Sequence, residues 1–190
     1  MENKEILESG QYLTFTLGEE EFALEIAKVR EVLDYTNVTK VPRAPVYMQG
    51  VINLRGNVVP IIDLRLTLGM SAIEKAVDTC IIIAEVTIDG DIIQMGALAD
   101  SVQEVVDIDP GNISPPPTLG TKLNTDFIKG MGKRGEEFLI ILDIDKVLAS
   151  SDLAAVASAV QNAEGRKQSV DTKAEDNLEK EEAPDELIPA

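Results

Sequence analysis

The chain has 190 residues, a formal net charge of −17, one cysteine and no histidine. This charge argues against nonspecific nucleic-acid binding, which needs Lys and Arg to neutralise phosphates, and against docking on an anionic membrane face. Without histidine the chain lacks the usual general base and the commonest metal ligand, so we expect no metal and no cofactor. One cysteine excludes an internal disulfide and fits a reducing compartment. The first residues lack the apolar core of a signal peptide, and no apolar run approaches the ~18 residues of a membrane helix, so we expect a cytoplasmic protein without direct membrane insertion.

Short strand patterns follow one another from residue 12 onward. Residues 27–33 are ambiguous, and the spacing of Val29 and Val32 favours a helical turn. Pro45 can begin a short helix through residue 49. Asp89-Gly90 is a strong type I′ hairpin signal. The expected strands are 12–17, 21–26, 37–41, the two segments around Gly56, 79–88, 91–98, 101–108, 128–131 and 137–144.

About ten short strands in ~140 residues, with turn signals every ~8–12 residues, predict an all-β barrel or sandwich fold. No βαβ unit is present, so a parallel sheet is not expected. We divide the chain into a flexible N-terminus (1–10), a β domain (11–150), a C-terminal helix (151–165) and a disordered acidic tail (166–190).

The segment NLRGNVVPIIDLR, at 53–65, predicts a tight hairpin with Gly56-Asn57 as its two-residue loop. Alternation of side chains then places Arg55 beside the turn, where its guanidinium can reach solvent or a partner. The positions assigned to the inward face are Ile52, Leu54, Val58 and Ile62.

Catalytic constellations are not apparent in the sequence. Cys80 lies in an apolar strand without a cationic neighbour, which favours a core residue over a nucleophile. The paired aspartates near 107 and 143 lie at strand ends without the ligand density that calcium requires. What remains for function is surface: antiparallel strands leave edges, and packed lobes leave a groove for a partner's helix.

Five ordered blocks of sequence resemble CheW-type domains, the coupling modules of bacterial chemotaxis. They are KVREV (28–32), GV followed by NLRG and DLR (50–65), DSV followed by Val105 (100–105), GMG (130–132) and FLIIL (138–142). The resemblance runs from about Gln11 to about Ser150. It implies two small SH3-like, five-stranded antiparallel barrels packed together, with short helices.

The resemblance also implies a function and partners. Family members are non-catalytic adaptors that couple chemoreceptors to the histidine kinase CheA. One barrel docks the kinase's regulatory domain, and the groove between the barrels receives the helical-hairpin tip of a receptor. The adaptor is thereby recruited to membrane-associated receptor arrays.

Site residues are transferred only where the family motifs match. Arg55 is expected as a polar anchor at a partner interface, with a structural salt bridge, such as one to Asp63, as its alternative. Glu31, Val29 and Val32 match a contact segment, although both valines could be core residues. The remaining expected positions are Val102 and Val105, lining the groove or buried in a strand, Gly50 and Gly56 for backbone conformation, and Asp63 as an acceptor for buried amides.

Three other functions stay open at this stage. A β-barrel that binds a small ligand predicts an apolar cavity with convergent polar groups. A carboxylate-based hydrolase predicts an Asp or Glu with a raised pKa in a cleft. A coupling protein of a non-motility pathway, such as surface sensing or development, would carry the same motifs.

Overall fold

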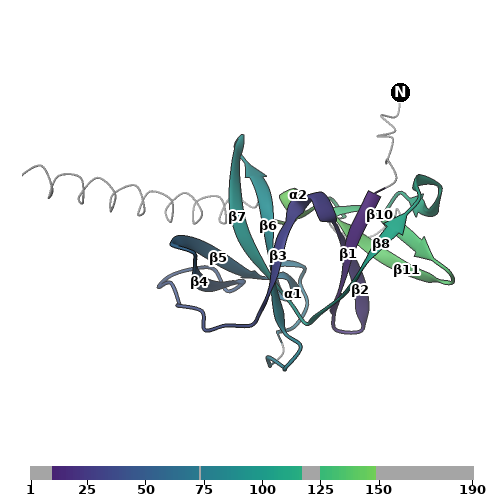
Figure 1. Ribbon diagram of the computed structural model, residues 1–190. Coiled ribbons are helices and arrows are strands. Elements are labelled where there is room, and N and C mark those ends of the chain that lie inside the picture. Colours follow the sequence, from purple (N-terminus) through teal and green to yellow (C-terminus); the bar gives the residue numbers. More distant parts are fainter. Residues whose placement is uncertain (1–9, 73, 117–124, 149–190) are drawn as a thin grey trace, which may run out of the picture.

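The computed structural model describes residues 10–72, 74–116 and 125–148. They form two lobes, each built on one β-sheet, which Figure 1 shows side by side. Lobe 1 is a six-stranded sheet with the order β8-β1-β2-β11-β10-β9, and lobe 2 is a five-stranded sheet with the order β3-β6-β7-β5-β4. The predicted all-β fold of two small packed lobes is confirmed. The helix predicted at 151–165 and the acidic tail lie outside the described residues.

The strands of lobe 1 are β1 (Gly10–Leu17), β2 (Glu20–Glu25), β8 (Ser101–Ile108), β9 (Ile113–Ser114), β10 (Ile128–Arg134) and β11 (Glu137–Leu142). The strands of lobe 2 are β3 (Val29–Asp34), β4 (Met48–Leu54), β5 (Asn57–Asp63), β6 (Cys80–Ile88) and β7 (Asp91–Ala99). The helical elements are η1 (Ile26–Lys28), α1 (Leu64–Thr67), η2 (Pro110–Asn112) and α2 (Ile144–Leu148). No helix among the described residues is long and apolar enough to cross a membrane.

The chain crosses between the lobes twice. It leaves lobe 1 after β2, passes through η1 and enters lobe 2 at β3. It returns at Asp100, the single residue between β7 and β8. Lobe 2 is therefore one continuous segment inserted between the two halves of lobe 1, and each crossing leads directly into the edge strand of a sheet.

Three apolar clusters hold this arrangement together. The largest contains residues of both lobes, such as Phe15 of β1 and Ile82 of β6. Two smaller clusters each draw on one lobe alone. In β6, Ile81 and Ile83 belong to the lobe 2 cluster, whereas Ile82 belongs to the shared cluster. Because neighbouring residues of a strand face opposite sides, both faces of β6 are buried along its first five residues, which explains the apolar run CIIIA at 80–84.

Several local predictions need correction. Residues 27–33 are not mainly helical: only the short η1 precedes strand β3. Residues 37–41 form only an isolated bridge from Thr39 to Val51, and residues 45–49 form no helix, since β4 begins at Met48. Each sheet also contains one parallel pair, β2 with β11 and β5 with β7, which an antiparallel reading of short strands misses.

The hairpin prediction also needs correction, because its loop is Arg55-Gly56, one residue earlier than expected. This shift places Val58 opposite Asn53. Val58 and Ile62 therefore lie on the opposite face to Ile52 and Leu54.

Lobes 1 and 2 contain the same β-hairpin followed by a helical turn, with equivalent residues 80 positions apart. The N–H of Asp63 donates to the carbonyl of Tyr47 at 2.7 Å, and the N–H of Asp143 donates to that of Phe127 at 2.8 Å. Both hairpins shift register at the same place, directly before a glycine. The equivalent pairs are Tyr47/Phe127, Gly50/Gly130, Asp63/Asp143 and Arg65/Asp145.

Candidate partner-binding site

The tip of the β4–β5 hairpin places Arg55 in an unusual backbone conformation. Arg55 and Gly56 have φ values of 53° and 92°, as a type I′ turn requires at both central positions. The N–H of Gly56 donates to Oδ1 of Asn53 at 2.9 Å, which closes the turn. Nothing lies within 4 Å of a Cβ built on Gly56, so this glycine serves backbone conformation rather than close packing.

Arg55 is joined to Glu31 by a bidentate ion pair. Its Nη1 and Nη2 donate to Oε1 and Oε2 of Glu31 at 2.8 and 2.9 Å. The Arg55 side chain is 74% exposed and that of Glu31 is 24% exposed. The structure thus brings together two residues predicted separately from the sequence, and the salt bridge suggested with Asp63 does not form. Hydrogen bonding to Glu31 raises the pKa of Arg55, so the guanidinium stays charged.

Asp63 is buried and caps α1. Its Oδ1 accepts from the N–H groups of Arg65 and Leu66, as an N-cap aspartate does. Burial raises its pKa, and the two backbone N–H groups offset this only in part. Asp63 therefore acts within the fold and has no access to a partner.

The other predicted contact residues lie on β3 and β8, one edge strand from each sheet. Val29 and Val102, near the starts of these strands, are partly buried against the shared cluster. Val32 and Val105 are 41% and 47% exposed. Each edge strand therefore contributes one valine to the lobe junction and presents one to solvent.

A repeated motif links the two edge strands. Residues 29–34 and 102–107 both read V-x-E-V-x-D. The pairing of β3 with β6 shifts register between Val29 and Glu31, and that of β8 with β1 shifts between Val102 and Val105. Such bulges re-aim side chains at sheet edges. The repeat is the sequence signal that identifies Glu104 as the lobe 1 counterpart of Glu31.

Glu104 has an arginine partner, as Glu31 does. Nη1 of Arg134, at the tip of the β10–β11 hairpin, donates to Oε1 of Glu104 at 3.0 Å, and its Nη2 donates to Glu21 at 3.1 Å. Both lobes thus tie a hairpin tip to an edge strand by an Arg–Glu pair. The predictions above did not include Arg134 or Glu104.

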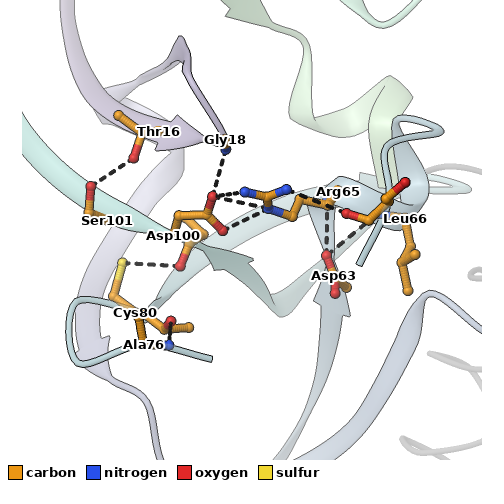
Figure 2. A network of polar contacts seen from close by, with 12 residues as sticks. Thr16, Gly18, Asp63, Arg65, Leu66, Ala76, Cys80, Asp100 and Ser101 are labelled. Carbon is orange, nitrogen blue, oxygen red and sulfur yellow. Dashed lines mark hydrogen bonds and ion pairs between the residues drawn. The ribbon is translucent and has the colours of Figure 1, made fainter. Parts of the chain in front are cut away.

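A second set of charged residues lies where the chain crosses between lobes. Figure 2 shows the guanidinium of Arg65 against the carboxylate of Asp100, which also accepts from the N–H of Gly18 at 2.6 Å. At the other crossing, Nζ of Lys28 donates to Oδ2 of Asp145 at 2.7 Å. We refer to Arg65–Asp100 and Lys28–Asp145 as the crossover pairs.

A cavity of about 150 Å³ beside α2 is lined by both charged and apolar residues. Its lining includes Glu25, Lys28, Lys129 and Asp145. These four already form two ion pairs, Lys129–Glu25 at 2.6 Å and Lys28–Asp145 at 2.7 Å. The cavity therefore offers no free charge from these four groups for recognition of a small ligand.

Cys80 lies in the shared cluster. Burial raises the pKa of its thiol to about 11, so the reactive thiolate is scarce at neutral pH. This cysteine behaves as a core residue.

Comparison with known proteins agrees with this geometry. Residues 11–152 match the family model described as the CheW-like domain. The chain is 35% identical over 152 residues to the chemotaxis protein CheW of Klebsiella aerogenes, covering 80% of this chain and 89% of that one. Over 148 residues it is 34% identical to the chemotaxis protein CheW of Helicobacter pylori, covering 77% and 84%.

A solved structure extends the match to three dimensions. The crystal structure of the scaffolding protein TtCheW from Thermoanaerobacter tengcongensis has a TM-score of 0.67 and 35% sequence identity, covering 76% of this chain and 95% of that chain. Family model, sequence relatives and fold all agree, and this chain belongs to the CheW family.

Proposed function

We propose that this chain is a non-catalytic adaptor that couples chemoreceptors to the histidine kinase CheA in chemotaxis signal transduction. This function is supported by membership of the CheW family, and the match to that family covers most of the chain. The kinase would dock through its regulatory domain, which is homologous to this chain, and the receptor would insert the tip of its cytoplasmic helical hairpin at the junction between the lobes. Assembly with both would recruit the adaptor to membrane-associated receptor arrays.

The Arg55–Glu31 pair is the observation that supports a contact role most directly. A guanidinium has five N–H donors, and Glu31 takes two of them. The pair thus orients the side chain, which is 74% exposed, and leaves its other N–H donors free of Glu31. A pre-oriented donor loses little conformational entropy when it binds a carboxylate or carbonyl of a partner. Val32, the next residue of β3, faces the other side of that strand and is 41% exposed, so it offers a separate apolar contact.

The mechanism is positional. An adaptor that binds both receptor and kinase holds the kinase where a change in receptor conformation can bias its activity. The effect is a coupling free energy between two binding sites, and no bond is made or broken by the adaptor.

The two alternatives with their own chemistry fit the site less well. In the cavity beside α2, the charged groups of Glu25, Lys28, Lys129 and Asp145 are taken up by two ion pairs, whereas a barrel for a small ligand predicts polar groups free to bind it. Asp63 has the raised pKa that a hydrolase predicts, but it is buried and engaged in capping α1. The cavity beside α2 therefore does not fit a small-ligand site, and Asp63 does not fit a catalytic acid.

The test is binding of the full chain to its cognate CheA regulatory domain and to a receptor cytoplasmic fragment. Arg55→Glu should weaken binding to one of the two at least about tenfold, or ~1.4 kcal/mol, while the melting temperature changes little. Arg134→Glu is the matched control, because it alters the equivalent hairpin tip of lobe 1.

The charge swap Arg55→Glu with Glu31→Arg separates contact from structure. If the pair only ties the hairpin to β3, the swap restores binding to the wild-type level. If Arg55 contacts the partner, binding stays weak although the pair has been rebuilt. Unchanged affinity of Arg55→Glu for both partners would overturn the proposed contact role.

A further inference from the structure

Each crossing between the lobes leads at once into an edge strand that carries proposed contacts. Lys28 ends η1, and the next residue, Val29, begins β3. Asp100 follows β7, and the next residue, Ser101, begins β8. The position of each crossing residue therefore sets where its edge strand starts.

The two crossing residues, Asp100 and Lys28, are both charged. Each forms an ion pair with a residue of a short helix, α1 or α2. Asp100 pairs with Arg65 of α1, with Nε of Arg65 at 2.8 Å from Oδ1. Lys28 pairs with Asp145 of α2 at 2.7 Å. Arg65 and Asp145 occupy equivalent positions, 80 residues apart, directly after the first residue of each helix. The same type of ion pair thus occurs twice. In one the helix carries the cation and the crossing the anion, and in the other these charges are exchanged.

In both crossover pairs, the aspartate also accepts a hydrogen bond from a backbone N–H. Asp100 accepts the N–H of Gly18 in the β1–β2 turn of lobe 1 while it binds Arg65 of lobe 2. Asp145 of lobe 1 accepts the N–H of Thr87 in β6 of lobe 2 at 2.8 Å while it binds Lys28. Each aspartate therefore connects three segments: the crossing and one element of each lobe.

Apolar packing alone does not fix the starts of the edge strands. The shared cluster holds the lobes together, but hydrophobic contact is not directional. Within the described residues, β3 pairs only with β6, and β8 only with β1. Both pairings are interrupted by a bulge close to the strand's start, where the ladder is weakest.

We propose that the crossover pairs are positioning elements that fix the starts of β3 and β8, and with them the placement of Val29 and Glu31 relative to Val102 and Val105 across the lobe junction. The identity of the ligand at this junction, a receptor helical hairpin, rests on the proposed function.

The two crossover pairs differ in how much of their side chains is exposed to solvent. The side chains of Arg65 and Asp100 are 10% and 23% exposed, whereas those of Lys28 and Asp145 are 30% and 31% exposed. Salt screens exposed charges more than buried ones, so ionic strength should loosen β3 before β8.

Hydrogen–deuterium exchange of the full chain, measured by mass spectrometry, tests the proposal. Lys28→Gln should speed exchange in residues 29–34 by about twofold and leave residues 101–108 unchanged. Asp100→Asn should do the reverse. Lys28→Arg should keep wild-type exchange, because it restores the charge at the crossing. Lys146→Gln is the matched control, since Lys146 of α2 pairs at 3.3 Å with Asp143, the residue before that helix, and not with Lys28.

Exchange that rises equally throughout the chain, or does not change in the edge strands, would overturn the proposal. Binding to the receptor fragment gives the second readout: Lys28→Gln should weaken it several-fold, with recovery in Lys28→Arg. Faster exchange in β3 with wild-type affinity would mean that the pair does not position the contacts. If the wild-type chain fails to bind the fragment, the proposed function fails, while the strand-specific exchange still decides whether the pairs fix the edge strands.

Discussion

Lobes 1 and 2 share a backbone plan but differ in the side chains that they present. Positions that fix the backbone keep their residue type over the repeat, as Gly50/Gly130 and Asp63/Asp143 do. Positions at the surface or at the crossings do not: the equivalent of Arg65 is Asp145, and the equivalent of Arg55 is Gly135. The repeat therefore preserves the backbone geometry, while the two lobes differ in the charged side chains at the hairpin tips and at the crossings.

The largest expected effect comes from the two equivalent glycines. Gly50 has a φ of 141°, and a Cβ there would lie 2.1 Å from the carbonyl oxygen of Thr39. At Gly130 the nearest atoms are Cγ2 of Ile113 at 2.8 Å and the carbonyl oxygen of Ser114 at 3.0 Å. Gly50→Ala should therefore cost more than about 4 kcal/mol of unfolding free energy, and Gly130→Ala about 1–3 kcal/mol. Urea unfolding measures both, and equal losses would contradict the difference in crowding.

The next largest effects are expected at the crossover pairs, where removing one partner should cost different amounts of unfolding free energy. Arg65→Gln leaves the partly buried Asp100 without its partner, which should cost about 3 kcal/mol. Lys28→Gln removes a more exposed charge from Asp145, which should cost about 0.5 kcal/mol. The same unfolding experiment gives both values at low salt. A loss for Lys28→Gln as large as that for Arg65→Gln would show that exposure does not govern these pairs.

The two acidic groups beside Arg65 should respond to pH with opposite signs. Burial would raise the pKa of Asp100, but bonds from Arg65 and Gly18 outweigh it and hold the pKa below its ordinary value. Its stabilising effect is therefore complete above the unfolded pKa of about 3.9 and is lost as pH falls through the folded pKa. Burial raises the pKa of Asp63, so the folded state loses stability as pH rises from about 3.9 through the folded value.

Unfolding free energies between pH 3 and pH 7 test these signs. Relative to wild type, Asp100→Asn should become less stable as pH rises, and Asp63→Asn should become more stable. Asparagine is a suitable replacement at Asp63 because it also caps helices well. If the stability difference from wild type changed with pH in the same direction in both variants, the opposite pKa shifts of Asp100 and Asp63 would be refuted.

The smallest effect is expected where the lobes differ by a single oxygen. The hydroxyl of Tyr47 is buried and has no hydrogen-bond partner among the described residues, and the equivalent residue is Phe127. Tyr47→Phe should change the free energy of unfolding by less than about 0.5 kcal/mol, or stabilise slightly, because it removes an unsatisfied polar group. Thermal unfolding checks this, and a clear loss would reveal a partner for the hydroxyl.

Sequence patterns predicted those features that depend on near neighbours. The turn at Asp89-Gly90 forms with both φ values positive, at 52° and 91°. Arg55 was placed at the surface, as its exposure of 74% bears out. Strand periodicity and turn residues are local signals, so an all-β fold could be read from them.

Features that join distant segments could not be read in the same way. Arg65 and Asp100 are separated by 35 positions, and Lys28 and Asp145 by 117. Nothing in the local pattern singles out these charges from other surface charges. The helices α1 and α2, of four and five residues, are too short to show helical periodicity. Asp63 was expected as an acceptor for buried amides, whereas Asp143, whose Oδ1 accepts the N–H of Lys146 at 3.2 Å, was interpreted as a solvated strand end.

The insertion of lobe 2 within lobe 1 has a consequence for the order of folding during synthesis. All strands of lobe 2 lie between residues 29 and 99, so that sheet can close as soon as its segment has emerged. In lobe 1, Phe22 of β2 must wait for Ile140 of β11, its parallel partner. At roughly 5–20 residues per second, the ribosome needs on the order of ten seconds to make the intervening chain. For that interval the β1–β2 hairpin exposes on a nascent polypeptide the apolar side chains that β11 later covers.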